Sequence, residues 1–156
     1  VRPFNTYGSR QSARAIIPTI ISQILNGKSE IELGSFTPTR DLTYVKDTCA
    51  GFEDIYKSNS LFGEVTNIGM EAEISIGKLA ELISKIMNVK MTIKSTDERI
   101  RPENSEVERL ICDNTKLLKQ TSWKPNYTLE RGIGEVIEWM KKTENLNYFK
   151  SDRYNV

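Results

Sequence analysis

The sequence predicts a small mixed α/β unit, and three observations lead to that prediction. Apolar residues recur at three-and-four spacing over residues 13–26 and 76–86, as on the buried face of a helix. Short apolar and β-branched runs stand between and after these stretches. Polar loops that contain glycine or proline separate the elements.

The first expected element is a strand end at residues 1–5, which residues 6–12 leave as a loop of small polar residues. A helix is expected over residues 13–26. Its apolar positions follow helical spacing, and Asn26-Gly27 supplies a stop signal.

The middle of the chain is expected to hold two short strands, at residues 31–33 and 42–45, with Pro38 in the loop between them. Asp47 follows the second strand. Its carboxylate can cap a helix that runs to about Lys57.

Residues 64–68 alternate like a strand, and Ser75 is expected to cap the clearest helix of the chain. The apolar residues of that helix line one face, as in any helix docked on a core. A further strand is expected at residues 90–94. The polar stretch 95–108 is long for a loop in a compact unit, and such loops tend to be functional or disordered.

Two helices are expected near the end of the chain, at residues 114–121 and 128–142. We expect Trp123 and Trp139 to pack in the core rather than to stack on a ligand base. Trp123 adjoins Pro125, and Trp139 lies on an apolar helical stripe.

Composition excludes several classes of function. The 156 residues carry 22 Lys and Arg against 21 Asp and Glu, so the net charge of +1 gives no long-range field for nucleic acid or an anionic membrane. Histidine is absent, which excludes a Cys/His zinc site and a histidine-based triad. We therefore expect no metal site and no nucleic-acid or membrane partner.

The two cysteines, Cys49 and Cys112, belong to no CxxC motif. No apolar run approaches the ~20 residues of a membrane span, and no charged-then-apolar leader opens the sequence. We therefore expect a cytoplasmic protein in which both cysteines are buried, reduced thiols.

The chain opens directly into the stretch VRPFNTYG. A short strand needs neighbours that satisfy its backbone, and no upstream residues supply them. We therefore expect residues 1–156 to be one domain, a fragment of a longer chain whose N-terminal portion is missing.

Four motifs occur in the order VRPFNTYGSRQSARAIIP, TPTRDLTYVKDT, TNIG with EISIGKLAELI, and RPENSEVERL before DNTKLLKQTSWKP. Together they resemble the C-terminal half of extended short-chain dehydrogenase/reductases, the NAD-dependent epimerase/dehydratase family that acts on nucleotide sugars. Within that family the chain most resembles UDP-N-acetylglucosamine 4,6-dehydratases. The resemblance implies that this domain is the small α/β lobe that binds the nucleotide sugar, without the N-terminal Rossmann half.

This chain lacks the residues that the family uses for catalysis. The family's NAD site rests on a glycine-rich turn at a helix N-terminus, and neither GxGxxG nor GxxGxxG occurs here. The family's catalytic pair is Tyr-x-x-x-Lys, and no tyrosine here has a lysine four residues later. The resemblance implies that the missing half holds most of the NAD site. The complete reaction would be oxidation at sugar C4, loss of water across C5 and C6, and return of hydride to C6.

Two arginines are candidates for the substrate diphosphate, because a planar guanidinium makes paired, charge-assisted hydrogen bonds to phosphate. Arg40 follows a proline-containing loop, and the family assigns this role to the arginine of its RDxxYV segment. The alternative for Arg40 is a surface ion pair with the neighbouring Asp41 or with Asp47. Arg101 matches the family's Arg-Pro arginine, and Arg99 competes with it for the role.

Two asparagines are further candidates. Asn5 ends the opening strand, and the family's N-x-Y-G asparagine faces the substrate diphosphate; a turn-stabilising side chain is the alternative. Asn67 matches a family position near the nucleotide, with a strand-end cap as the alternative.

The start of the first helix is expected, as in relatives, to close over the nucleotide base. Arg14, Ile16 and Ile17 belong to this segment, although both isoleucines can equally face the core. Pro3 and Phe4 lie where relatives approach the nicotinamide, so we expect them to meet NAD when the missing half is present.

Two alternatives to a dehydratase stay open: an epimerase or reductase half, and a stand-alone, non-catalytic nucleotide-sugar-binding or interaction module. An open reading frame that starts just before Val1 favours the module, and a glycine-rich half upstream favours the enzyme. The family's dimer-forming helices lie mostly in the missing half. A homodimer is therefore an expectation for the full-length protein rather than for this chain.

Overall fold

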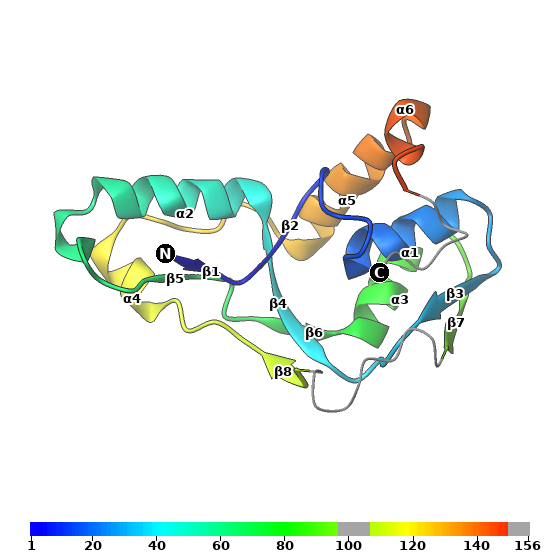
Figure 1. The fold of residues 1–156 in the computed structure, drawn as a ribbon, viewed down its shortest axis with the longest axis horizontal. Helices are drawn as coiled ribbons and strands as arrows, with labels where there is room; N and C mark the ends of the chain where they lie inside the picture. Colours follow the sequence, from blue (N-terminus) through cyan, green and yellow to red (C-terminus); the bar gives the residue numbers. More distant parts are fainter. Residues whose placement is uncertain (97–106, 150–156) are drawn as a thin grey trace.

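The structure is a computed structural model, which describes residues 1–96 and 107–149. Its central element is β4 (Thr39–Tyr44), which runs between two groups of elements in Figure 1. β4 pairs in parallel with β2 (Asn5–Tyr7) and β8 (Arg109–Leu110), and antiparallel with β6 (Glu73–Ser75). The register sets Asn5 beside Leu42, and Arg40 beside both Ile74 and Leu110.

The group that we call the larger lobe contains most of the buried apolar residues. It consists of α1 (Ile16–Leu25), α3 (Ile76–Ile86), α5 (Leu129–Met140) and α6 (Thr143–Leu146), with β3 (Glu30–Leu33) parallel to β7 (Thr92–Ser95). α1, α3 and α5 contact one another through apolar stripes at helical spacing. The fully buried side chains there include Ile20, Ile21, Leu79, Ile83 and Ile133.

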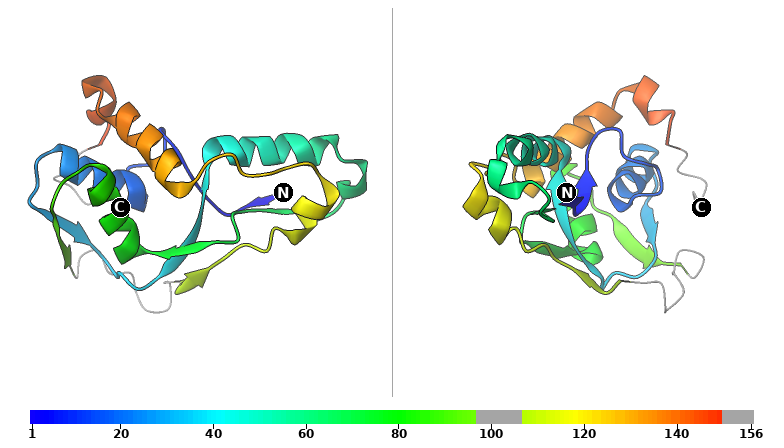
Figure 2. Two further views of the ribbon diagram at one scale, coloured as in Figure 1. Left: turned by 180° about the vertical axis from the view of Figure 1, so that it is seen from behind. Right: turned by 60° about the vertical axis from the view of Figure 1, so that its left-hand side comes forward.

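The group that we call the smaller lobe is built on two short parallel strands, β1 (Arg2–Pro3) and β5 (Asn67–Ile68). It also contains α2 (Val45–Lys57), η1 (Asn59–Leu61) and α4 (Thr115–Gln120). Its buried apolar cluster consists of Ile68, Leu117 and Trp123. Gly51 lets α2 approach β5, because a Cβ at this position would lie 2.9 Å from Ile68 Cδ1. Figure 2 shows from two further sides that α2 and α4 lie next to this strand pair.

Two buried carboxylates fasten loops to these elements. Asp41, 0% exposed, accepts hydrogen bonds from the backbone N–H groups of residues 70 and 71, both at 2.9 Å, and of Cys112 at 3.0 Å. Asp47, 1% exposed, accepts from the N–H groups of residues 126 and 127 at 2.9 and 3.0 Å. Each bond to a charged acceptor contributes roughly 1.5–3 kcal/mol, so both side chains hold distant segments together.

Most helices lie close to the ranges that apolar spacing predicts. Ser75 Oγ accepts the Lys78 N–H at 3.3 Å, which confirms the expected cap of α3. α1 begins later than expected, at Ile16, and Pro18 falls in its first turn, where a backbone N–H would have no partner within the helix.

Three local predictions are wrong. Asp47 does not cap α2: it lies in the first turn and binds the loop at residues 126–127, and the N-cap residue Tyr44 makes no side-chain capping bond. Arg40 lies within β4 rather than before a strand, because unpredicted pairing with β6 and β8 extends β4 back to Thr39. Cys49 is exposed rather than buried.

None of the helices in residues 1–96 and 107–149 has the length and apolar character that a membrane crossing needs. Over the same residues, no three side chains of Cys, Asp or Glu are grouped so that they could hold a metal ion.

Candidate functional site

An open cleft of about 630 Å³ is bordered by β2, the start of α1, the end of β3 and β4. Several residues that the sequence singled out line this cleft: Pro3, Phe4, Asn5, Arg14, Ile16 and Arg40. Its other lining residues are Thr6, Gln11, Ala15, Thr19, Leu33, Gly34, Ser35, Pro38, Leu42, Ile76 and Leu110. Segments far apart in the sequence therefore meet at one concave surface.

Arg40 is half-buried on the β4 wall of the cleft. Its Nη1 donates to the carbonyl oxygens of Thr39 at 2.8 Å and Val107 at 2.6 Å, so the backbone beside β8 orients the guanidinium. The carboxylates of Asp41 and Asp47, its alternative partners, accept hydrogen bonds from backbone N–H groups. A guanidinium held in this way can present a planar set of donors to an anion.

The start of α1 forms the facing wall. Ala15, the N-cap residue, makes no side-chain capping bond, and both Ala15 and Ile16 line the cleft. The first N–H groups of a helix have no partner within the helix, and together with the helix dipole they favour an anion. Arg14 lies just before this helix end and is exposed. The cleft thus places a helix N-terminus and two arginines around one volume.

Asn5 and Gln11 stand at the β2 side of the cleft. Asn5 is the first residue of β2 and is half-buried. Gln11 Nε2 donates to the Thr6 carbonyl oxygen at 3.0 Å, while its Oε1 is buried and has no hydrogen-bond partner among the described residues. An amide oxygen in this position can accept a hydrogen bond from a ligand.

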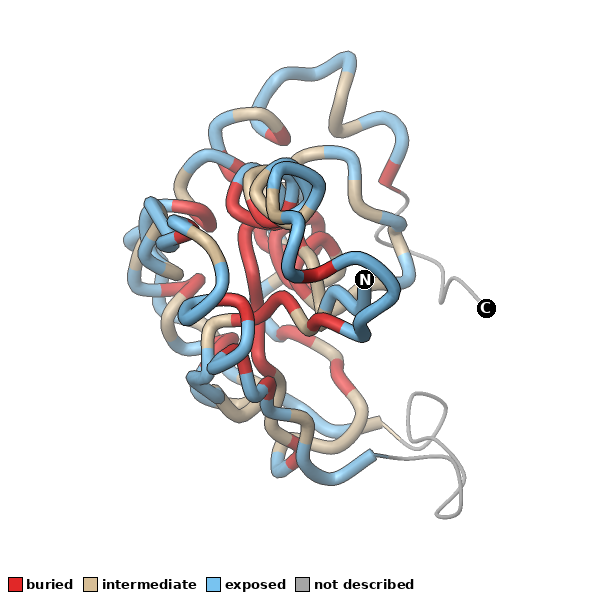
Figure 3. The backbone as a smooth tube through the Cα atoms, turned by 90° about the vertical axis from the view of Figure 1, so that its left-hand side faces the viewer, coloured by how far each residue is buried: buried red, intermediate tan, exposed pale blue. Residues whose placement is uncertain are grey.

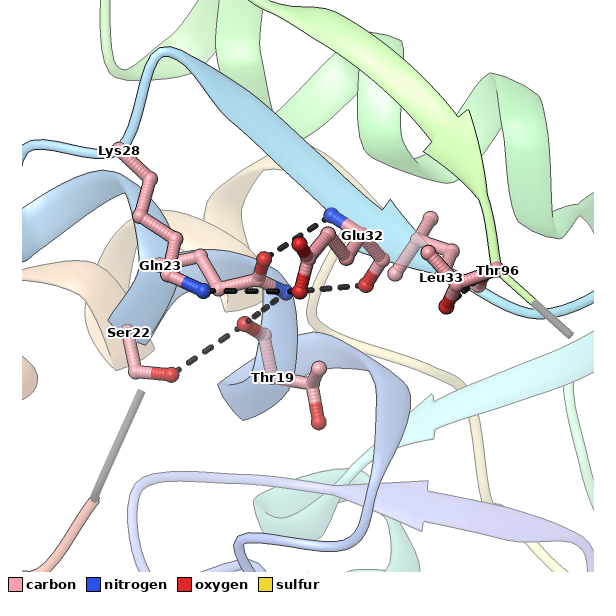
Figure 4. Close-up of polar contacts among 7 residues, drawn as sticks. All are labelled: Thr19, Ser22, Gln23, Lys28, Glu32, Leu33 and Thr96. Atoms are coloured by element: carbon pink, nitrogen blue, oxygen red, sulfur yellow. Dashed lines mark hydrogen bonds and ion pairs between the residues drawn. The ribbon is translucent and has the colours of Figure 1, made fainter. Parts of the chain in front are cut away.

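The β3 wall is fixed by a buried glutamine. Gln23, 1% exposed, accepts from the Glu32 N–H at 2.9 Å and donates to the Glu32 carbonyl oxygen at 3.1 Å, as Figure 4 shows. Gln23 Nε2 also lies 3.2 Å from the carbonyl oxygen of Thr19, which lines the cleft. These contacts join α1 to β3 and so set the distance between two walls of the cleft.

An ion pair fixes the strands beside Arg40. Arg109 donates to both carboxylate oxygens of Glu73 through Nε at 3.0 Å, and to one of them through Nη2 at 2.8 Å. Thr39 donates to the same carboxylate at 2.6 Å. The hydrogen bonds from Arg109, and then from Thr39, lower the pKa of Glu73. The pair therefore joins β4, β6 and β8 at the end of β4 that carries Arg40.

Three of the residues chosen from the sequence are not placed on the cleft. Ile17, 1% exposed, packs in the core of the larger lobe, which was its alternative interpretation. Asn67 lies in β5, and its Nδ2 donates to the Asp113 carbonyl oxygen at 3.3 Å. Arg101, like its competitor Arg99, lies outside the described residues.

The comparison with known families decides the identity of the fold. The family model described as GDP-mannose 4,6 dehydratase matches residues 1–136. The chain belongs to this family. Its resemblance to the C-terminal half of extended short-chain dehydrogenase/reductases is thereby confirmed.

Relatives of this family member come from several organisms. The UDP-N-acetyl-alpha-D-glucosaminuronate decarboxylase of Bacillus cytotoxicus is 33% identical over 154 residues, which are 93% of this chain and 46% of the relative. The UDP-N-acetylglucosamine 4-epimerase of Methanobrevibacter ruminantium, solved with UDP-N-acetylmuramic acid, is 30% identical, with a TM-score of 0.77 over 89% of this chain and 44% of its own. The UDP-glucuronic acid 4-epimerase of Bacillus cereus, solved with UDP-glucuronic acid and NAD, is 26% identical, with a TM-score of 0.80 over 90% of this chain and 44% of its own. The chain therefore spans a little under half the length of these relatives.

Proposed function

We propose that this chain is the nucleotide-sugar-binding lobe of an NAD-dependent nucleotide-sugar 4,6-dehydratase whose substrate is a UDP-N-acetyl sugar. The observation that carries the proposal is the convergence of Arg40, Asn5 and the start of α1 on one cleft. The cleft volume, about 630 Å³, falls within the range of small-molecule sites, roughly 300–1,000 Å³.

In this proposal the diphosphate lies between β4 and the start of α1. Arg40 and Arg101 donate paired hydrogen bonds to the phosphate oxygens, and the Asn5 amide adds a further donor. The helix N-terminus at Ala15 favours the negative charge. The base packs against the apolar side chain of Ile16. Ile17 and Asn67 have no part in this arrangement.

UDP is proposed as the nucleotide because the three relatives described above are named for, or were solved with, UDP sugars. N-acetylated sugars are proposed because two of these three names carry an N-acetyl group. Titration of the complete enzyme with UDP and with GDP tests the nucleotide directly. Tighter binding of GDP would contradict this part of the proposal.

NAD would be held by the part of the enzyme that carries a glycine-rich turn, which this sequence lacks. When bound, NAD supplies the hydride exchange of the reaction. The contribution of this chain is to bind and orient the nucleotide sugar, with Pro3 and Phe4 at the edge of the cleft that faces the cofactor. Phe4 is half-buried, so its ring can help to exclude water from that edge.

The diphosphate site is tested by Arg40→Lys and Arg101→Lys in the complete enzyme. Each variant replaces a planar set of donors by a point charge, so we expect UDP to bind on the order of tenfold to a hundredfold more weakly, with NAD affinity nearly unchanged. Arg131→Lys is the matched control, because Arg131 lies on α5, stacks on Tyr127 and does not line the cleft. Unchanged UDP affinity in both test variants would overturn the site. Weaker UDP binding in Arg99→Lys, but not in Arg101→Lys, would assign the diphosphate contact to Arg99 instead of Arg101.

The division of labour is tested by activity. We expect the purified 156-residue chain to show no turnover of UDP-N-acetylglucosamine, because its sequence contains neither the glycine-rich turn nor a Tyr-x-x-x-Lys pair. The assay compares this chain with the complete enzyme at equal concentration. Turnover by the chain alone would show that it is not merely a substrate lobe.

A further inference from the structure

The ion pair of Arg109 and Glu73 reaches across β4 on the side away from the cleft. β4 lies between β6 and β8 at this point, and the pair joins these two neighbours, while the Thr39 hydroxyl of β4 donates to the same carboxylate. Side chains alternate between the two faces of a strand, so Thr39 and Arg40 point to opposite faces. Arg40 lines the cleft, whereas Thr39, Glu73 and Arg109 do not. We call these last three residues the cross-strand clamp.

The cross-strand clamp holds the segment that orients Arg40. Arg40 Nη1 donates to the Val107 carbonyl oxygen at 2.6 Å, so one acceptor for the guanidinium stands two residues before β8 rather than in β4 itself. β8 is two residues long, which leaves few backbone hydrogen bonds to fix its place. Arg109 is the first of these two residues, and its contacts with Glu73 add a side-chain attachment there. The direction of the Arg40 guanidinium therefore depends on contacts made behind the strand that carries it.

The geometry of the pair favours a role in orientation over a role in stability. The Glu73 carboxylate accepts hydrogen bonds from Arg109 and Thr39 at 2.6 to 3.0 Å. Several hydrogen bonds between a guanidinium and a carboxylate fix the position of both groups. The Arg109 side chain is 66% exposed, and exposed ion pairs contribute little to the free energy of unfolding, because water screens the charges.

We propose that Glu73 and Arg109 are positioning residues for the nucleotide sugar, which hold the β8 segment so that Arg40 presents its donors to the diphosphate. This inference rests on the proposed function, because it takes Arg40 as a diphosphate contact. It assigns the precision of that contact to a charged pair outside the cleft. Leu110 follows Arg109 in β8 and lines the cleft, so the same pair also holds this part of the wall.

The direction in which Glu73→Gln changes UDP affinity distinguishes positioning from a simple field effect. Removal of a carboxylate near an anion site reduces repulsion, so a field effect alone would tighten UDP binding. Loss of positioning weakens binding, because the neutral amide offers Arg109 and Thr39 one acceptor oxygen in place of two. In the complete enzyme we expect UDP to bind roughly threefold to tenfold more weakly, a smaller effect than that of Arg40→Lys.

Glu64→Gln is the matched control. It removes the same charge from an ion pair of 3.0 Å with Lys116 of α4, which lies in the smaller lobe and does not line the cleft. UDP affinity should be unchanged in this variant. Urea unfolding of both glutamine variants should give midpoints close to that of the parent, which separates positioning from a general loss of structure.

A double-mutant cycle shows whether Glu73 acts through Arg40. In an Arg40→Lys background, Glu73→Gln should no longer weaken UDP binding, because lysine has no planar set of donors to misorient. Charge reversal of the pair, Glu73→Arg with Arg109→Glu, should recover most of the affinity that either reversal alone removes.

Arginine side-chain NMR tests the cross-strand clamp without any ligand. The complete enzyme carries isotope-labelled arginine, and the Arg40 signal is identified by its loss in Arg40→Lys. Glu73→Gln should speed the rotation of the Arg40 guanidinium, whereas Glu64→Gln should not. UDP affinity and guanidinium rotation are separate measurements, so failure of the proposed function and failure of the clamp are seen separately.

Three outcomes would overturn the inference. Unchanged or tighter UDP binding in Glu73→Gln, together with weaker binding in Arg40→Lys, would keep the diphosphate site and remove the cross-strand clamp from it. Equal weakening by Glu73→Gln in the parent and in the Arg40→Lys background would show that Glu73 does not act through Arg40. Unchanged rotation of the Arg40 guanidinium in Glu73→Gln would show that the pair does not hold it.

Discussion

The larger and smaller lobes bury their helices in different ways. In the larger lobe, α1 and α3 present rows of isoleucine and leucine that interlock in one extensive cluster. In the smaller lobe, the buried positions of α2 are Asp47, Thr48 and Gly51, and the buried apolar cluster is confined to Ile68, Leu117 and Trp123 among the described residues. Figure 3, which views the molecule from the smaller lobe, shows long exposed segments around short buried stretches there.

The contrast shows that the larger lobe has a much more extensive apolar core than the smaller lobe. Burial of apolar area contributes about 25 cal/mol per Å², so a lobe with few buried apolar side chains depends more on hydrogen bonds and on neighbours. In the smaller lobe, the hydrogen bonds of Asp41 and Asp47 hold distant backbone segments in place. The following predictions test this contrast.

The largest effect is expected for Asp41→Ala. The substitution leaves three backbone N–H groups without their charged acceptor, and we expect the free energy of unfolding to fall by at least about 3 kcal/mol. Urea unfolding followed by circular dichroism measures the loss. Asp54→Ala is the control: Asp54 is only half-buried and accepts one long bond from Ser122, so its removal should cost less than about 1 kcal/mol. Equal losses in the two variants would show that burial does not determine how much each carboxylate contributes to the free energy of unfolding.

The next prediction compares the stability lost when a side chain is shortened in each lobe. Ile83→Ala, at a side chain 0% exposed in the larger lobe, should destabilise the 156-residue chain by about 2–5 kcal/mol, because it opens a cavity. Phe52→Ala, at a side chain of α2 that is 45% exposed, should change stability by less than about 0.5 kcal/mol in the same chain. Thermal or urea unfolding of both variants gives the comparison. A large loss for Phe52→Ala would mean that α2 packs on its own lobe through this face.

The two cysteines offer a third, pH-dependent contrast. Burial, and then the nearby Asp41 carboxylate, raise the pKa of Cys112 from 9.0 to about 12. Above pH 9 the unfolded chain loses this proton while the folded chain keeps it. Stability should therefore be complete below pH 9 and fall as the pH rises towards 12, by at most about 1.4 kcal/mol per pH unit. Burial also raises the pKa of Tyr7, which acts in the same direction.

Cys112→Ala measures this contribution, because the variant should lose stability less steeply between pH 9 and 12 than the parent. Native-state alkylation of the 156-residue chain at pH 8 should modify Cys49 and leave Cys112 intact. Under non-reducing conditions, mass spectrometry should show two free thiols. A mass lower by two protons, or equal alkylation of both cysteines, would contradict the different environments of the two cysteines.

The elements that local sequence determines were the ones that could be predicted. The helix after Ser75 combines a capping hydroxyl with an apolar stripe, and both signals lie within one short stretch of sequence. β6 and β8 could not be predicted in this way, because they are two or three residues long and exist through pairing with β4. The same pairing moved Arg40 into a strand. Asp47 looked like a cap because its binding partners at residues 126–127 are distant in sequence.

The residues that line the cleft also divide into those that the sequence indicated and those that only the fold brings together. Asn5, Arg14, Ile16 and Arg40 stand in motifs that resemble a family, and they line one cavity. Gln11, Thr19, Ser35 and Leu110 also line it, but no binding role was expected for any of them, although Gln11 and Leu110 stand in the same motifs. For Gln11, its position in the loop that leaves the Asn5-containing strand was the available signal.

The smallest expected effect concerns the helix starts of the larger lobe. α3 and α5 each begin with a side-chain cap, from Ser75 and Thr128, whereas α2 has none. Ser75→Ala removes the acceptor of the Lys78 N–H and should lower the free energy of unfolding by about 1 kcal/mol. Ser75→Asn should recover most of it, since asparagine also caps well.

Urea unfolding of both Ser75 variants checks this prediction, with Ser29→Ala, at an exposed position between α1 and β3, as the control for loss of a hydroxyl. An unchanged midpoint for Ser75→Ala would show that pairing of β6 with β4, which also ends at Ser75, holds the start of α3 without the cap. In that case α3 would depend on tertiary contacts at its N-terminus, as α2 does.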